Sequence, residues 1–198
     1  MKKKNKIITV IGLSCAIIVG SSVGTYFILY ALADEPVFEL PVHGLDDATG
    51  IQVFHDNRST QLHVGFDFKL ENDTEIFAPI PGVISLISKH QMSNGYWIID
   101  VFITYNIKWD MFIAFEPWTQ DESVINNQML NISVQVGDIV VQNQSLGILN
   151  PVSGSEFPHI HWSIREGGQY RSPYDYCSTS ARSGIEYLCD KFDKFPED

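Results

Sequence analysis

The sequence predicts an all-β domain, built as an antiparallel sheet or barrel-like sandwich of short strands. Two observations predict it. From residue 61 onward, short runs rich in Ile, Val and aromatic residues alternate with turns that contain Gly, Pro or Asn. Helical signals are confined to Glu122 to Leu130 and to the tail, residues 169–198. The chain after residue 33 is long enough to form one domain with its own core.

The N-terminus predicts export. Four lysines precede an uncharged apolar run, residues 7–33, which is long enough to span a bilayer. The lysines before this run and Asp34 and Glu35 after it indicate a cytoplasmic N-terminus and an exported body. Because residues 31–33 read ALA, cleavage after Ala33 is an alternative. We expect a signal-anchor or signal peptide, and a domain that is held outside the membrane or secreted.

The chain is acidic, with 13 basic and 24 acidic residues and a formal net charge of −11. Without the four N-terminal lysines, 9 basic residues stand against 24 acidic ones, a net charge of −15. A surface of this sign repels nucleic acid and anionic lipid. We therefore expect no nucleic-acid partner and no electrostatic attraction to anionic polymers.

The elements follow one another along the chain. Residues 34–60 form an approach segment, kept extended at its start by Pro36 and Pro41. A core domain of residues 61–168 comes next, in which Asn94 and Gly95 predict a hairpin turn. The expected strands cover residues 76–77, 83–88, 96–105 and 111–115, followed by a helix at 122–130 and a tail at 169–198.

The tail contains Cys177 and Cys189, the only cysteines outside the N-terminal apolar run. In an exported chain an isolated pair of cysteines indicates a disulfide, here closing a small loop. Two free thiols or two metal ligands are the alternatives, although a spacing of twelve residues with no nearby histidine is a poor zinc knuckle. The sequence thus predicts a short disulfide-linked tail.

Two histidine motifs point to a metal site. Side chains alternate faces along a strand, so His159 and His161 point to one side, whereas Ile160 and Trp162 point to the other. Two imidazoles on one face can share a small cation. One short motif of this kind arises often by chance, so the case depends on a second one.

The second motif supplies the rest of a ligand set. His63 and Asp67 flank Gly65, and a bend at this glycine would turn both side chains toward a common point. Two histidines and one aspartate, with a fourth position left to water, form the ligand set of a catalytic zinc site. The spare histidine of the later pair is then free for proton transfer or for stabilising an oxyanion.

Together these motifs resemble the lysostaphin and LytM-type zinc metallopeptidases, which cut peptide cross-links in bacterial cell walls. Residues 62–68, LHVGFDF, resemble the first zinc motif of that family. Residues 134–147 resemble the hairpin before the last motif, and residues 154–162 resemble that motif itself. The resemblance implies the duplicated hybrid motif fold and Zn²⁺ as cofactor, with His63, Asp67 and His161 as zinc ligands and His159 as the catalytic histidine.

One position departs from the family pattern. The family carries a further active-site histidine on a middle strand, whereas residues 111–118 of this chain read MFIAFEPW. Phe115 or Glu116 falls where that histidine is expected. Glu116 is a candidate general base, a candidate metal ligand that excludes water, or a solvated strand end before Pro117.

The sequence therefore predicts a zinc-dependent endopeptidase, with peptidoglycan cross-links as the expected substrate and with His159 and Glu116 as catalytic residues. A catalytically impaired domain that binds wall peptide or regulates a hydrolase is the alternative. A peptidase for another protein is a third reading, because nothing in the sequence identifies the substrate. The expected partners are a cell-wall peptide or another peptide substrate and, through the N-terminal segment, the membrane.

Overall fold

The computed structural model describes residues 25–55, 57–58 and 61–196. The chain divides into two compact units, Met1–Asp34 and Glu35–Asp198. All residues predicted to form the metal site belong to the second unit, which is described below.

In the first unit, residues 25–31 are helical. The membrane segment expected at residues 7–33 lies mostly outside the residues that the structure describes. Among the described residues, no helix has the length and apolar character needed to cross a membrane.

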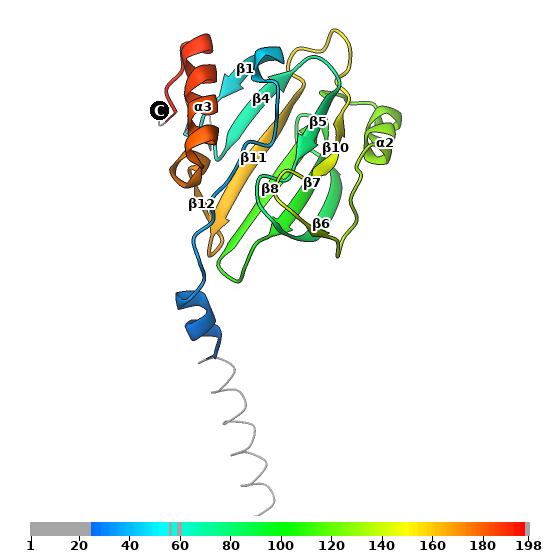
Figure 1. Ribbon diagram of the computed structural model, residues 1–198. Coiled ribbons are helices and arrows are strands. Elements are labelled where there is room, and N and C mark those ends of the chain that lie inside the picture. Colours follow the sequence, from blue (N-terminus) through cyan, green and yellow to red (C-terminus); the bar gives the residue numbers. More distant parts are fainter. Residues whose placement is uncertain (1–24, 56, 59–60, 197–198) are drawn as a thin grey trace, which may run out of the picture. The chain divides into compact units, whose positions relative to one another are not determined.

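Strands dominate the second unit, as the sequence predicts (Figure 1). They are β1 (Ala48–Gln52), β2 (Asn57–Arg58), β3 (Gln61–Leu62), β4 (Phe66–Leu70), β5 (Thr74–Phe77), β6 (Gly82–Gln91), β7 (Trp97–Thr104), β8 (Trp109–Glu116), β9 (Ile139–Val140), β10 (Ser145–Leu149), β11 (His159–Glu166) and β12 (Gln169–Arg171). The helical elements are η1 (Leu45–Asp47), α2 (Glu122–Leu130), η2 (Pro173–Tyr176) and α3 (Thr179–Phe192).

One antiparallel sheet organises this unit. Its strands lie in the order β1-β4-β11-β8-β7-β6-β9, and β12 pairs with β11 as a hairpin. β5 pairs with β10, and β2 pairs with β3, in two further small sheets. Because β11 lies between β4 and β8, the three strands that carry four of the five predicted site residues are neighbours (Figure 1).

The central strands turn apolar side chains to the core and polar side chains to the opposite face. On β11, Ile160 and Trp162 are fully buried, as the alternation predicts. Phe66 and Phe68 are fully buried on the neighbouring strand β4. Burial of each large apolar side chain contributes about 1.5–3 kcal/mol. The core face of these strands therefore fixes the direction in which their polar side chains point.

The predicted hairpin at Asn94 and Gly95 joins β6 to β7. Gly95 has a φ of 88°, a left-handed conformation that glycine adopts without strain. Its N–H donates to the carbonyl oxygen of Met92 at 2.9 Å. This turn holds Met92 and Asn94 at the rim of the pocket described below.

Both α-helices occur where the sequence predicts helix. α2 begins after Asp121, whose carboxylate accepts a hydrogen bond from the Ser123 N–H at 2.8 Å. α3 begins after Ser178, whose hydroxyl caps the helix in the same way. Ile185 and Leu188, on one face of α3, are fully buried in the domain core.

The predicted disulfide is wrong, because Cys177 and Cys189 are both buried free thiols. Cys189 lies ten residues into α3, about 15 Å along the helix axis from the helix start. A disulfide needs Cα atoms within about 7 Å of each other. Burial raises the pKa of Cys177 to about 12 and that of Cys189 to about 11. Both thiols therefore stay protonated and pack as small apolar groups.

The approach segment packs into the same unit as the core domain. Its Phe38 is buried, and the Phe38 ring lies 5.8 Å from the Trp162 ring. The N–H of Phe38 donates to the carbonyl oxygen of Tyr176 at 2.9 Å, so this segment also ties down the tail. β1 then forms one edge of the main sheet beside β4.

Candidate metal centre

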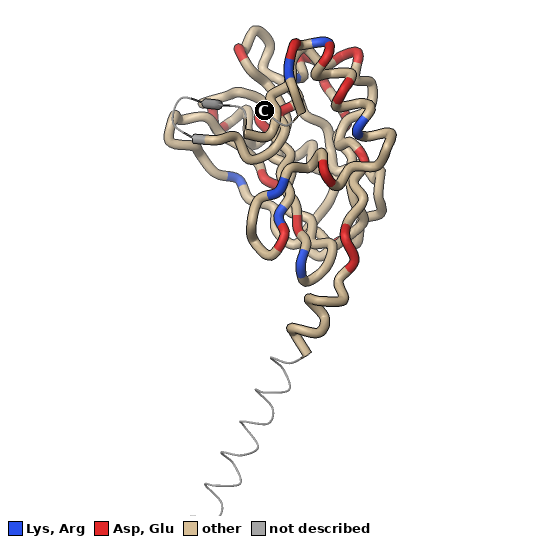
Figure 2. The backbone as a smooth tube through the Cα atoms, turned by 90° about the vertical axis from the view of Figure 1, so that its left-hand side faces the viewer, with Lys and Arg blue, Asp and Glu red and all other residues tan. Residues whose placement is uncertain are grey.

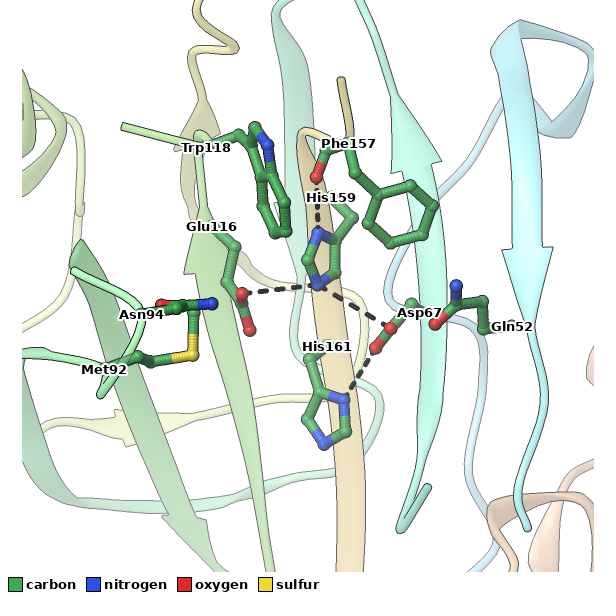
Figure 3. Close-up of a pocket in the computed structure, with 9 residues that line it drawn as sticks. All are labelled: Gln52, Asp67, Met92, Asn94, Glu116, Trp118, Phe157, His159 and His161. Carbon is green, nitrogen blue, oxygen red and sulfur yellow. Dashed lines mark hydrogen bonds and ion pairs between the residues drawn. The ribbon is translucent and has the colours of Figure 1, made fainter. Parts of the chain in front are cut away.

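Sheet pairing brings the predicted site residues together on one face. His161 of β11 lies opposite Asp67 of β4, and His159 of β11 lies opposite Glu116 of β8. Paired residues of antiparallel strands point to the same side of the sheet. Figure 3 shows the four side chains converging on one pocket. His63 joins them from the short loop between β3 and β4.

Gly65 is what allows this loop to approach β11. A Cβ at this position would lie 2.7 Å from Oγ of Ser163 and 2.9 Å from Cε1 of His161, and it would also meet the carbonyl oxygen of Trp162. Real Cβ atoms do not come this close to other heavy atoms. The glycine is therefore required by close packing, and it holds His63 beside His161.

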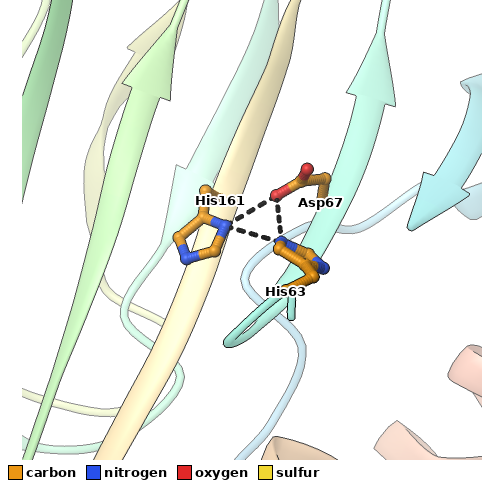
Figure 4. A group of neighbouring side chains, drawn as sticks. All are labelled: His63, Asp67 and His161. Atoms are coloured by element: carbon orange, nitrogen blue, oxygen red, sulfur yellow. Dashed lines mark hydrogen bonds and ion pairs between the residues drawn. The ribbon is translucent and has the colours of Figure 1, made fainter. Parts of the chain in front are cut away.

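Three potential ligand atoms converge (Figure 4). Nε2 of His63 lies 3.0 Å from Oδ1 of Asp67 and 3.0 Å from Nδ1 of His161. Nδ1 of His161 lies 2.7 Å from the same carboxylate oxygen. His63 is 4% exposed and Asp67 is fully buried. These residues form the one group of three or more His, Cys, Asp or Glu side chains in the described chain that is close enough to hold a metal ion.

Hydrogen bonds on the far side of each imidazole fix its tautomer. Nδ1 of His63 donates to the carbonyl oxygen of Val53 at 2.7 Å. The Ser163 hydroxyl donates to the carbonyl oxygen of Val64, so its own oxygen accepts from Nε2 of His161 at 2.7 Å. Neutral His63 and His161 therefore both turn a lone pair toward the carboxylate. Lone pairs this close repel one another, and a cation among them removes the repulsion, so the donor set fits a divalent metal.

His159 lies outside the ligand cluster but borders it. Its Nδ1 donates to the carbonyl oxygen of Phe157 at 2.7 Å, which leaves Nε2 facing the pocket. Nε2 lies 3.4 Å from Oε2 of Glu116 and 3.7 Å from Oδ2 of Asp67 (Figure 3). Burial alone would lower the pKa of His159, but these two carboxylates raise it to about 9.

The carboxylate of Asp67 lies between the imidazoles. Burial alone would raise its pKa, but the three imidazoles that surround the carboxylate, with His159 contributing most, hold the pKa well below its usual range. Asp67 therefore stays ionised, as a metal ligand must.

The sequence left open whether Phe115 or Glu116 occupies the position at which the family has its further histidine. In the structure Glu116 lies opposite His159 and lines the pocket, whereas Phe115 lies opposite Ile160 and is fully buried in the core. The residue that occupies the site face of this strand is therefore the glutamate.

Two cavities meet at the site. The first, of about 370 Å³, is lined by Asp67, His159, His161 and Glu116 and is bordered by Trp118. Trp118 stacks on Tyr96 with ring centroids 4.4 Å apart and has a φ of 64°. A left-handed tryptophan costs on the order of 1 kcal/mol or more, a strain of the kind that clusters at functional sites.

The second cavity, of about 320 Å³, shares His161 and Glu116 with the first. It also contains His90 and Asp100, which the sequence did not single out. His90 lies beyond the strand expected at residues 83–88, near the end of β6. The sequence does contain a feature that could have pointed to Asp100: it is the one charged residue within β7, in an otherwise apolar run.

No protein-family model and no curated protein matches the sequence. Solved structures do. A zinc-containing peptidase from Vibrio cholerae matches with a TM-score of 0.50 at 16% identity, over 70% of this chain and 40% of that one. Csd3 from Helicobacter pylori matches with a TM-score of 0.50 at 15% identity, over 79% of this chain and 40% of that one. The antimicrobial peptidase lysostaphin from Staphylococcus simulans matches with a TM-score of 0.49 at 16% identity, over 75% of this chain and 55% of that one.

This chain spans less than two thirds of each of these three proteins, so the similarity concerns one part of each. At identities of 15–16%, it is a similarity of fold. The resemblance expected from the sequence is confirmed at that level: this chain has the fold of the Vibrio cholerae zinc-containing peptidase and of Helicobacter pylori Csd3.

Proposed function

We propose that this protein is a zinc-dependent endopeptidase of the cell envelope, with peptide cross-links of the bacterial cell wall as substrate. The observation that carries the proposal is the convergence of His63 Nε2, Asp67 Oδ1 and His161 Nδ1 beside a pocket that also holds His159 and Glu116. The fold shared with a zinc-containing peptidase supports the reaction type. The choice of wall cross-links depends on the sequence motifs.

The ligand residues define what the metal contributes. His63, Asp67 and His161 would hold Zn²⁺, which supplies Lewis acidity for a scissile carbonyl and the means to activate water at neutral pH. The backbone carbonyl of Val53 and the hydroxyl of Ser163 hold the two imidazoles in the tautomers that ligation requires.

Glu116 and His159 would move protons and stabilise charge. Glu116 accepts a proton from the attacking water as the oxygen adds to the peptide carbon, and then passes this proton to the departing nitrogen as the C–N bond breaks. Nε2 of His159 lies 3.4 Å from Glu116 and is placed to donate to the oxygen that becomes negative. The bond from Nδ1 to the Phe157 carbonyl keeps the ring in this orientation.

The test is hydrolysis by the purified, zinc-loaded full chain. Substrates are isolated cell walls, synthetic peptides that reproduce several cross-link types, and an unrelated unfolded protein. We expect cleavage of wall peptides by the wild type, and loss of cleavage in His161→Ala. Absence of cleavage of every wall substrate despite full zinc occupancy would overturn the proposal, and cleavage of the unrelated protein alone would reassign the substrate.

A second candidate function follows from Glu116. This residue stands where the family pattern has a histidine, and its carboxylate pairs with His159 at 3.4 Å. If this pair closes the site to water, the domain binds wall peptide or regulates a hydrolase without cleaving. That function predicts zinc binding and peptide binding by the wild type, with no hydrolysis by the wild type or by Glu116→His.

A further inference from the structure

The second cavity carries a carboxylate that the proposed hydrolysis does not use. Asp100 of β7 lies opposite Ala114 of β8, which lies opposite His161 of β11. The three side chains therefore share the site face of the sheet. Because Ala114 is small, it leaves open the space between Asp100 and His161, and this space is part of the cavity of about 320 Å³.

One oxygen of Asp100 has no partner. The residue is 8% exposed, and no donor among the described residues reaches its buried Oδ1. The other oxygen lies 3.5 Å from Nδ1 of His90, a residue at the cavity's rim with a half-exposed side chain. Burial, opposed by His90 and reinforced by Glu116, raises the pKa of Asp100 to about 6. At neutral pH the cavity therefore holds a carboxylate that is poorly compensated.

The charges around the cavity select a cationic ligand. Asp100 and Glu116 are its two acidic residues, and the other titratable groups that line it are the imidazoles of His63, His90 and His161. Neither acidic residue belongs to the described cluster that is tight enough for a metal ion, which consists of His63, Asp67 and His161. A primary ammonium carries three donors on one small charged group, so it can satisfy Oδ1 of Asp100 and still reach a second acceptor.

We propose that Asp100 binds a primary ammonium group of the peptide substrate. This rests on the proposed function in one respect, namely that a peptide occupies the site. Asp100 is then a specificity-determining residue, and it selects peptides that carry a free amine on one side of the scissile bond.

The distance from the metal centre fits such a group. Asp100 lies two strands away from His161, about 10 Å at the usual strand spacing. A free N-terminus two to three extended residues away from the scissile bond spans about that distance. A lysine-type side chain next to the scissile bond covers the larger part of it, and the Asp100 side chain covers the rest. The two sources share the same chemistry, and the experiment separates them.

The experiment measures peptide binding by calorimetry on the metal-depleted full chain, so that no cleavage interferes. Three versions of one short peptide with a single lysine are compared: N-acetylated with the lysine free, N-terminus free with the lysine acetylated, and both amines acetylated. The proteins are the wild type, Asp100→Asn, and Asp73→Asn. The last removes the same charge at an exposed position outside both cavities.

We expect the wild type and Asp73→Asn to bind one of the singly acetylated peptides about tenfold to a hundredfold more tightly than the doubly acetylated one. Whichever of these two peptides binds more tightly shows whether the bound ammonium group comes from the lysine side chain or from the N-terminus. Asp100→Asn should bind all three with similar affinity. Zinc stoichiometry and near-ultraviolet circular dichroism check that this variant keeps its fold.

Equal binding of all three peptides by the wild type would overturn the inference without use of any variant. A preference that persists in Asp100→Asn would overturn it as well. The same experiments distinguish failure of this ammonium site from failure of the proposed peptidase function. A chain that shows the Asp100-dependent preference but cleaves nothing when loaded with zinc retains the binding site and loses the peptidase assignment, whereas a chain that cleaves amine and acetylated peptides equally loses only the site.

Discussion

The two halves of the pocket differ in how completely their polar atoms are paired. In the ligand half, formed by His63, Asp67 and His161 on β4, β11 and the loop before β4, each imidazole is held on its far side by a carbonyl or hydroxyl. In the open half, formed by Glu116 and Asp100 on β8 and β7, Oδ1 of Asp100 has no donor within the described chain. The ligand half is thus organised before anything binds, whereas we propose that a substrate completes the open half.

This difference matches the different requirements of a metal site and of a peptide-binding surface. A metal site must hold its ligands in one geometry, because affinity depends on preorganised tautomers and distances. A peptide-binding wall can leave acceptors unpaired when the ligand brings the donors. Figure 2 marks acidic positions in several parts of the backbone, and two acidic residues, Asp100 and Glu116, line the second cavity.

The largest expected effect lies in the ligand half. The wild-type chain should contain about one zinc per molecule after metal loading and gel filtration. His63→Ala, Asp67→Ala and His161→Ala should each release it, because two ligands do not hold the ion tightly. His159→Ala should keep it, since His159 lies outside the converging atoms. Elemental analysis measures the metal, and zinc retained by His161→Ala or lost from His159→Ala would contradict the assignment.

In the open half, Glu116→Gln should reduce kcat for wall-peptide hydrolysis by about a hundredfold or more while zinc stays bound. The amide keeps the shape of the side chain but cannot accept the proton from water. Glu75→Gln, at an exposed position of β5, is the charge-matched control and should leave the rate unchanged. Loss of zinc from Glu116→Gln would instead identify this residue as a ligand and remove the distinction between the two halves.

A smaller effect is expected where the chain approaches β11. Gly65→Ala places a methyl group against Ser163, His161 and the Trp162 backbone, and should reduce the free energy of unfolding by about 1–3 kcal/mol. Gly50→Ala on the neighbouring strand β1 meets only an ordinary contact at 3.4 Å and is the matched control. Urea denaturation measures both. Equal stabilities would mean that the loop before β4 is less tightly packed than the structure has it.

The smallest expected effect concerns the tail, which belongs to neither half. Because Cys177 and Cys189 are free thiols, a reductant should leave the thermal unfolding midpoint unchanged. Both thiols should react with a thiol reagent only after unfolding, since they are buried. A mass two units lower in the oxidised chain, restored by reductant, would show that the disulfide exists after all.

The alternation of β11 made part of this site predictable. His159 and His161 had to share a face, and Trp162 had to face the core, because a strand has a period of two. The bend at Gly65 was also visible, although its cause, the approach of β11, required the fold. Strand patterns did not decide between Phe115 and Glu116, because residues 111–115 of β8 are all apolar and hide which face is buried.

Other expectations failed for physical reasons that a sequence does not state. The cysteine pair looked like a disulfide because spacing along the chain says nothing of the axial rise of the intervening helix. Asp100 was missed because a single charge in an apolar run stands out only when its neighbours across the sheet are known. His90 fell outside the expected strand, residues 83–88, whereas β6 extends three residues further, to Gln91.

Four of the five site residues lie within paired strands, and this has a consequence for folding. Asp67, His159, His161 and Glu116 meet only because β4, β11 and β8 pair in one register. A slip of one residue on β11 would turn both histidines into the core and Trp162 into the pocket. A chain with that error has lost its chelating atoms, so the ion stabilises correctly paired molecules alone, by about 2.7 kcal/mol at a free metal concentration a hundred times Kd. Metal present during folding would therefore act as a check on strand pairing.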